Sequence, residues 1–309
     1  MTDIATLTLN PTIDVSYEVD RVFHTHKIRA LNEHYDPGGG GINVARVFVR
    51  LGGNARCFYL SGGATGPALD GLLDLHQLVR NRIPIKGQTR VCTTAHEHES
   101  GKEYRFIPPG PTIAPEEWQE CLDRLAEASC SYLVASGSLP PGVPEDFYAR
   151  VAAIASRRGM KMVLDSSGSG LRGGLAEGKI FLVKPSRGEL QQLAGKDLDS
   201  AERIASAAME IVAKEQAEYV AVTMGHEGAL LAHKSGTLRL PALAIEAKSA
   251  VGAGDSFLAA MVFGLSSGWD PVEAFRFGIA AGAAAVLTQG TDLCQPDDIR
   301  RLFPLVARA

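Results

Sequence analysis

The chain has 309 residues, of which 45% are hydrophobic and 21% charged, an ordinary composition for a globular protein. This length predicts about two domains or one large α/β domain with an elaboration, and it can bury a core without disulfide or metal staples. The 31 basic and 35 acidic residues give a net charge of −4, which argues against a surface that coats nucleic acid.

Neither a membrane segment nor an export signal is visible in the sequence. The longest apolar run, 277–287, is shorter than the roughly 18 residues of a membrane span, and the first residues lack a basic stretch followed by an apolar one. The five cysteines are scattered and form no CxxC pair, which argues against a disulfide framework or a zinc cluster. We therefore expect a cytoplasmic protein that binds neither membranes nor nucleic acid.

Apolar, β-branched segments alternate with segments of helical periodicity through most of the chain. We expect strands at 4–9, 55–60, 132–135, 161–164, 180–183 and 219–223. We expect helices near 42–51, 66–80, 115–128, 145–158, 187–194 and 200–214, followed by a helix-rich end at 254–266, 271–288 and 297–307. Such alternation predicts a mostly parallel sheet with helices on both faces.

Two segments, 12–36 and 88–107, break this alternation. The first is polar without a helical apolar stripe, and the second contains two short strand-like runs around Glu99–Lys102. We expect both to supply antiparallel strands to one small sheet outside the core. Open α/β sheets bind ligands at the carboxyl ends of their strands, so a small sheet beside that edge would act as a lid.

A first glycine-rich motif follows Pro37. Gly38, Gly39, Gly40 and Gly41 precede a predicted amphipathic helix that begins near Ile42. Amides exposed at the start of a helix attract anions or sugar hydroxyls, because the helix dipole and the free N–H groups point at the ligand. The alternative is a flexible connection, but glycines are costly to order without a purpose.

A second glycine-rich motif runs from Ser249 to Phe257. Gly252 and Gly254 let the backbone turn its amides toward a phosphate, and Asp255 falls in the first turn of a predicted helix. Phosphoryl transfer needs mainly positioning and charge stabilisation, so one carboxylate base beside a cluster of amides would suffice. The alternative is that Asp255 only caps the helix.

Four cations fall in the two lid segments. Lys27 and Arg29 are two residues apart, so on a strand they would point to the same side, and Arg90 and Arg105 lie in the other segment. If the segments share a sheet, the four side chains can converge on a phosphate, for which arginine is well suited. The alternative is ordinary solvated surface charge.

These motifs make the chain resemble the ribokinase/PfkB family of carbohydrate kinases over essentially its whole length. The resemblance is carried, in order, by Thr8–Pro11 with Asp14, Gly38–Arg46, Ser136–Gly142, Asp165–Ser167, Lys184–Pro185, Thr223–Gly228 and Ser249–Ser256. The nearest subgroup is the PfkB-type 6-phosphofructokinases. The resemblance implies a single Rossmann-like α/β/α three-layer domain over 1–309, with a β-sheet lid that often forms a dimer interface, so we expect a homodimer.

The resemblance also implies roles for individual residues. Asp255 would be the general base for the sugar C1 hydroxyl, and the amides of Gly252, Ala253 and Gly254 would hold the transferring phosphate of ATP. Sugar-phosphate binding would fall to Asp14, Gly38, Gly39, Gly40, Gly41, Asn43 and Ser138, and to Lys27, Arg29, Arg90 and Arg105. ATP binding would fall to Lys184, Ser186, Thr223, Gly225, Gly228 and Ala250. Glu189 would order Mg²⁺ through water, and a monovalent cation such as K⁺ remains an option.

Three positions depart from the family pattern. Ser186 opens Ser186-Arg187-Gly188-Glu189 where the family has Asn, Ala250 stands where Thr is usual, and Thr288 stands where relatives often have Asn. The first departure would alter the Mg²⁺ network, because serine lacks the second arm of the amide. The departures at Ala250 and Thr288 would affect the part of the site that binds the nucleotide.

The implied reaction transfers the γ-phosphate of ATP to D-fructose 6-phosphate, giving fructose 1,6-bisphosphate. Kinases for fructose 1-phosphate usually carry Gly-Lys-Gly where this chain has Gly39-Gly40-Gly41. Tagatose 6-phosphate and fructose 1-phosphate stay open as alternative substrates. From other classes, we weigh a non-catalytic sugar-phosphate sensor, and a nicotinamide oxidoreductase built on the GxGxxG match at 168–173.

Overall fold

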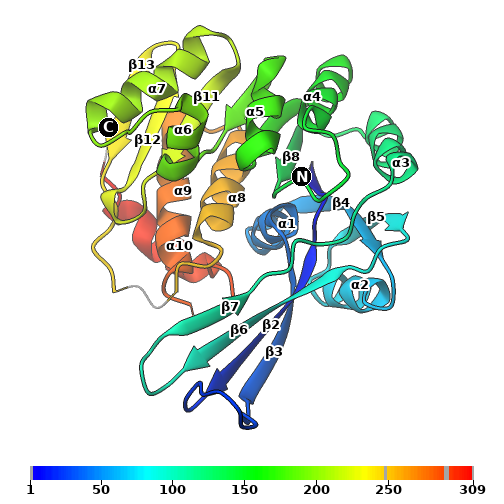
Figure 1. Ribbon diagram of the computed structural model, residues 1–309. Coiled ribbons are helices and arrows are strands. Elements are labelled where there is room, and N and C mark those ends of the chain that lie inside the picture. Colours follow the sequence, from blue (N-terminus) through cyan, green and yellow to red (C-terminus); the bar gives the residue numbers. More distant parts are fainter. Residues whose placement is uncertain (1–2, 247–248, 289–291, 308–309) are drawn as a thin grey trace.

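A computed structural model, shown in Figure 1, describes residues 3–246, 249–288 and 292–307. Its core is a nine-stranded sheet in the order β13-β12-β11-β10-β9-β8-β1-β4-β5. The strands are β1 (Asp3–Thr8), β4 (Asn54–Gly62), β5 (Val79–Ile85), β8 (Tyr132–Ser136), β9 (Lys161–Asp165), β10 (Ile180–Val183), β11 (Ala217–Thr223), β12 (Ala229–His233) and β13 (Gly236–Leu240). Neighbouring strands run parallel from β11 to β5, and β12 and β13 pair antiparallel at one edge.

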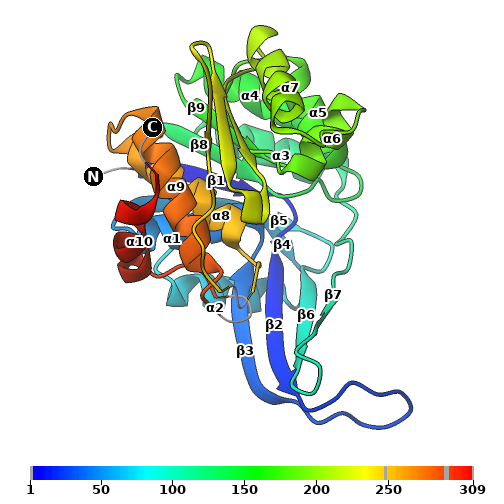
Figure 2. The same ribbon diagram turned by 90° about the vertical axis from the view of Figure 1, so that its left-hand side faces the viewer.

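Helices cover both faces of this sheet, as Figure 2 shows. One face carries α1 (Gly40–Arg50), α2 (Gly66–Leu75), α8 (Ala253–Ser266), α9 (Pro271–Ala285) and α10 (Pro296–Leu302). The other carries α3 (Pro115–Ala126), α4 (Phe147–Arg157), α5 (Gly168–Ala176), α6 (Arg187–Ala194) and α7 (Ala201–Ala213). Strand residues alternate between the two apolar clusters, with Ile4 in one and Ala5 in the other. The predicted α/β/α core is therefore confirmed.

The predicted lid is a four-stranded sheet that projects from the core (Figures 1 and 2). Its strands are β2 (Thr12–Val19), β3 (Leu31–Gly38), β6 (Arg90–Glu97) and β7 (Glu103–Phe106), in the order β3-β2-β6-β7. The outer pairs are antiparallel as expected, but β2 and β6 are parallel. They run the same way because β2 follows β1 and β6 follows β5, and β1 and β5 belong to the parallel part of the core sheet.

Several elements differ from the prediction. The helix expected at 66–80 ends at Leu75, and β5 begins at Val79. The strands β12 and β13 and the helix α5 were not predicted, and α5 occupies the GxGxxG match at 168–173. Within the described ranges, none of the helices combines the length and apolar character that a membrane span requires.

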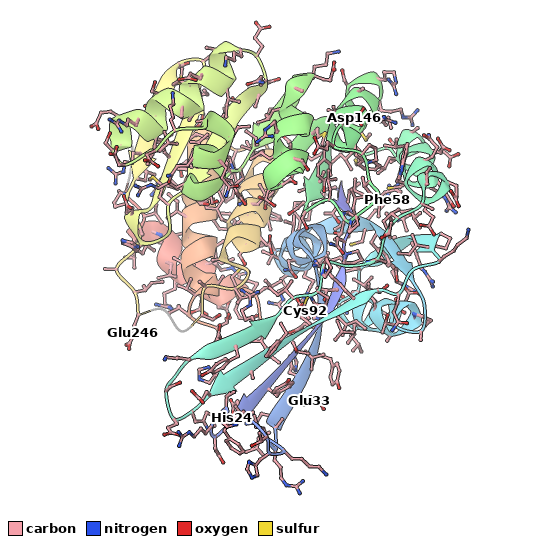
Figure 3. All side chains as sticks on the ribbon, viewed as in Figure 1. His24, Glu33, Phe58, Cys92, Asp146 and Glu246 are labelled. Atoms are coloured by element: carbon pink, nitrogen blue, oxygen red, sulfur yellow. The ribbon has the colours of Figure 1, made fainter. Side chains whose placement is uncertain are left out.

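The expected strand position of Lys27 and Arg29 is wrong. Both lie in the exposed loop 20–30 between β2 and β3, which contains no strand residue. The loop has no alternating apolar positions to pack on a sheet, so its polar residues face water. In Figure 3, His24 of this loop lies at the far end of the lid, whereas Cys92 of β6 lies near the core.

Candidate active site

Asp255 lies in the first turn of α8, directly after a glycine turn. Gly252 is the N-cap residue with φ of 72°, a left-handed conformation that favours glycine. A side chain at Gly252 would also overlap Leu293, which packs against this turn. The amides of residues 252–254 are thus exposed at the positive end of a helix of 14 residues.

One hydrogen bond links Asp255 to the other glycine-rich motif. Asn43 in α1 donates from Nδ2 to Asp255 Oδ2 over 2.8 Å. Burial raises the pKa of Asp255 to about 6, the nearby Asp165 acts in the same direction, and the Asn43 amide and Lys184 act against them. The carboxylate is therefore ionised at neutral pH, with a basicity closer to that of an effective general base than an exposed Asp has.

A buried ion pair lies beside this carboxylate. Lys184 Nζ is 3.1 Å from Asp165 Oδ1, and the Ser136 hydroxyl donates to Asp165 Oδ2 at 3.3 Å. Burial disfavours the ammonium form, but Asp165, Asp255 and Glu189 together raise the pKa of Lys184 above its ordinary value. From the sequence, Asp165 was predicted only as part of a family motif. Its position directly after the predicted strand 161–164, at the carboxyl edge of the sheet, was the signal that could have singled it out.

The glycines before α1 allow three close approaches of the backbone. A Cβ at Gly38 would overlap the Asp14 carboxylate, one at Gly40 would overlap the Ser136 hydroxyl, and one at Gly41 would lie 2.6 Å from the Leu7 carbonyl oxygen. Larger residues would push the start of α1 away from β1, β8 and the lid. The motif therefore packs tightly where the core meets the lid. Such close packing fits a binding site and does not fit a flexible linker.

Asp14 stands on β2 at the base of the lid. Burial raises its pKa to about 6; the Thr12 hydroxyl and the Arg90 charge lower it, whereas the Asp36 charge raises it. The pairing register places Arg90 and Arg105 on the same face of the lid sheet as Asp14. The Arg90 guanidinium also donates to the carbonyl oxygens of residues 10 and 108. Lys27 and Arg29, at the lid tip, do not join this group.

A cavity of about 410 Å³ opens beside the 252–254 amides. It is lined by Thr223 at the end of β11 with Gly225, His226 and Gly228 after it, by Ala250, Ala253, Gly254 and Phe257, and by residues that include Ile279 of α9 and Val286 directly after it. Four of the six residues predicted to bind ATP thus share one mainly apolar pocket. Lys184 lies at the edge, 3.4 Å from where a Gly254 side chain would begin.

The remaining predicted ATP residue, Ser186, is tied to Glu189 at the start of α6. The Ser186 hydroxyl accepts from the Glu189 amide, and a Glu189 carboxylate oxygen accepts from the Ser186 amide. Serine and asparagine are equally good N-cap residues, so the Ser for Asn departure preserves this local structure. Thr288 does not line the cavity; its hydroxyl lies 2.7 Å from the Ala285 carbonyl oxygen at the end of α9.

The donor chemistry fits Mg²⁺ bound largely through water and phosphate. Glu189 and Asp165 are both within electrostatic reach of Lys184 and offer hard oxygen ligands. Among the described residues no cluster of three His, Cys, Asp or Glu forms a ready-made metal site. Mg²⁺ commonly keeps several waters and uses one or two carboxylates with substrate phosphates, which this arrangement permits.

Comparison with known proteins identifies the family to which this chain belongs. Residues 3–298 match the model for the pfkB family of carbohydrate kinases. The chain belongs to this family. The prediction of the family is thereby confirmed for this kinase, and with it the prediction of an enzyme that transfers a phosphoryl group to an alcohol.

Individual relatives are similar over nearly the whole length of this kinase. It is 44% identical over 306 residues to the ATP-dependent 6-phosphofructokinase isozyme 2 of Mycobacterium tuberculosis, covering 98% of this chain and 90% of the relative. The crystal structure of phosphofructokinase-2 from Escherichia coli in complex with fructose-6-phosphate has a TM-score of 0.93 at 36% identity, with 100% of both chains covered. The same protein in complex with potassium has a TM-score of 0.95 at 37% identity, with 99% of both chains covered.

Proposed function

We propose that this kinase converts D-fructose 6-phosphate and ATP into fructose 1,6-bisphosphate and ADP. The observation that carries the proposal is the Asn43–Asp255 hydrogen bond, which joins the glycine motif at the lid base to the carboxylate beside the α8 amides. It puts a candidate sugar site and a candidate phosphate site on either side of one base. The names of the relatives at 36–44% identity support the choice of substrate.

In the proposed reaction, ionised Asp255 takes the proton of the C1 hydroxyl while that oxygen bonds to the γ-phosphorus of ATP. The bond between the γ-phosphorus and the β–γ bridging oxygen breaks, and ADP leaves with the electron pair. The amides of 252–254 and the Lys184 ammonium stabilise the charge on the transferring group, which is the main protein contribution in phosphoryl transfer. The pocket beside them holds the nucleoside.

Glu189 and Asp165 are the residues that would hold Mg²⁺, through water, beside the phosphates. When bound, the ion would neutralise part of the phosphate charge. A monovalent cation is a further option, supported by the potassium complex of the E. coli relative. Activity measured without Mg²⁺, and separately without K⁺, tests whether each of the two ions is required.

The 6-phosphate would bind at the lid. Arg90 and Arg105 stand on the Asp14 face, and Asp14 with the glycine loop would receive the sugar hydroxyls. Lys27 and Arg29 lie at the lid tip, so we assign them to the site of a second copy in a lid-to-lid homodimer. Large exposed apolar side chains on the lid support such pairing: Phe23, Ile28, Leu31, Tyr35, Phe106 and Ile107.

An ADP-release assay with Mg·ATP tests the substrate. Fructose 6-phosphate, tagatose 6-phosphate and fructose 1-phosphate are offered side by side, and we expect the highest kcat/KM for fructose 6-phosphate. Preference for another of the three would retain Asp255 as the base and reject the assignment of the lid cations. Sugar-phosphate binding by calorimetry with no turnover of any of the three would favour the sensor instead.

A further inference from the structure

Arg46 is a charged residue that is buried in the core. It lies in the middle of α1 and is only 2% exposed. Its Nη2 is 2.5 Å from Asp36 Oδ1, and its Nη1 donates to the Pro37 carbonyl oxygen over 3.1 Å. Both acceptors belong to the end of the lid strand β3, so one guanidinium ties a helix of the core to the lid.

The two acceptors lie on β3 beside Asp14, in residues that pair with Asp14 and with its neighbour Ile13. Asp36 is the ladder partner of Asp14, so their side chains stand on the same face of the lid sheet. The Pro37 carbonyl belongs to the peptide bond that leads into Gly38, and a Cβ on Gly38 would overlap the Asp14 carboxylate. Arg46 therefore fixes the backbone at Pro37 and Gly38, which the Asp14 carboxylate contacts.

Arg46 also balances the local charge. Two carboxylates directly opposite each other repel, and the Asp36 charge favours protonation of Asp14 whereas the Arg46 charge opposes it. Asp36 also faces His34 Nε2 at 3.2 Å and His76 Nε2 at 3.8 Å. The Arg90 charge also lowers the pKa of Asp14.

We propose that Arg46 is a positioning residue for the sugar-phosphate site: it fixes the end of β3 beside Asp14 and neutralises Asp36, and so sets the affinity for the sugar phosphate. Arg46 touches neither reactant, and the chemical step belongs to Asp255 on the opposite side of the site. The proposal rests on the proposed function for the role of Asp14 and for the choice of fructose 6-phosphate as the probe.

The test compares Arg46→Met with the double variant Arg46→Met/Asp36→Asn. Removing one partner of a buried pair leaves the other charge uncompensated. We expect Arg46→Met to raise KM for fructose 6-phosphate about tenfold or more, with kcat and KM for ATP within about threefold of wild type, because loss of ground-state binding appears in KM. The double variant removes the stranded charge and should recover most of the lost affinity.

The pH profile supplies a second readout. In Arg46→Met the acid limb of kcat/KM for the sugar phosphate should move to higher pH, because the Asp36 charge then raises the pKa of Asp14 without the opposing charge of Arg46. The acid limb of kcat at saturating sugar should stay in place, because it reports on Asp255. A structural defect alone would move neither limb selectively.

Arg276→Met is the matched control. Arg276 is also buried at 5% exposure, pairs with Glu273 at 2.8 Å and donates to backbone carbonyls, but those carbonyls belong to residues 306 and 307 near the chain end. We expect a lower Tm with unchanged KM and pH profile. Arg46→Lys serves if Arg46→Met does not fold, since it keeps the charge but loses the second donor. Its KM for fructose 6-phosphate should exceed the wild-type value, by less than the tenfold expected for Arg46→Met.

The proposal fails if Arg46→Met, or Arg46→Lys in its place, keeps the wild-type KM, or raises KM no more than the Arg276 control. It also fails if the double variant binds sugar phosphate as poorly as Arg46→Met. Absence of fructose 6-phosphate turnover in wild type is a different result, which rejects the proposed function. The same variants are then compared with whichever sugar phosphate wild type does phosphorylate or bind.

Discussion

The start of α8 and the lid sheet form the two sides of the proposed sugar-phosphate site, but they are built in opposite ways. The charged groups beside α8 are enclosed: Lys184 is 5% exposed and paired with Asp165, and Asp255 is bonded to Asn43. On the lid, Lys27, Arg29 and Arg105 are exposed to water.

The difference follows from what each region has to do. A general base gains from a buried environment that brings its pKa near the working pH, and the start of α8 provides one. A cation that binds a phosphate needs no such shift, and it must reach water to meet its ligand. Substitutions beside α8 should therefore affect kcat, whereas substitutions on the lid should affect KM.

Asp255→Asn should give the largest effect. Loss of a general base typically lowers kcat about 10²–10⁴-fold, and sugar-phosphate binding measured by calorimetry should persist. Folding raises the pKa of Asp255 from 3.8 to about 6, so stability falls as the pH rises between these two values, and the ionised group destabilises the protein by the full amount above about pH 6. The neutral variant should therefore be more stable at pH 7 by up to about 3 kcal/mol. Turnover near the wild-type rate would remove Asp255 from the mechanism.

Gly38→Ala probes the junction between the two regions. The new methyl group would overlap the Asp14 carboxylate, so we expect KM for the sugar phosphate to rise by roughly 30-fold, with a smaller change in kcat. Gly71→Ala in α2 is the matched control, because a Cβ there meets nothing within 4 Å. Equal KM values in the two variants would contradict the close approach of Gly38 to Asp14.

The pH dependence of kcat tests the raised pKa itself. Asp255 must be ionised to accept a proton, and its pKa is about 6, so kcat at saturating sugar should fall as the pH drops through that value. Below it, each pH unit should lower kcat about tenfold. A profile that stays flat down to pH 5 would show that burial does not control this carboxylate.

Arg105→Ala should give the smallest effect, confined to the lid. Arg105 is exposed, so its removal should cost no stability, and KM for the sugar phosphate should rise about fivefold with less change in kcat. Arg300→Ala on the distant, exposed surface of α10 provides the control. An unchanged KM in Arg105→Ala would take this cation out of the phosphate site.

Local patterns along the sequence were sufficient to predict much of the fold. The strands at 132–135 and 180–183, the helix at 187–194 and the two-part lid were all predicted within a few residues, because each has its own periodicity and turn residues. The short strands β12 and β13 and the helix α5 were missed. Each is short, so its pattern is weak until it packs against neighbours already in place.

The order of the motifs along the sequence was by itself enough to determine the family, the strand–helix alternation and the residues at the two glycine-rich sites. Only the tertiary structure decided that Asp165 pairs with Lys184, that Arg46 reaches Asp36, and that Lys27 and Arg29 lie far from Asp14 in one chain. The physical reason is that these relations depend on burial and distance between segments remote in sequence. Periodicity and spacing report only on neighbours along the chain.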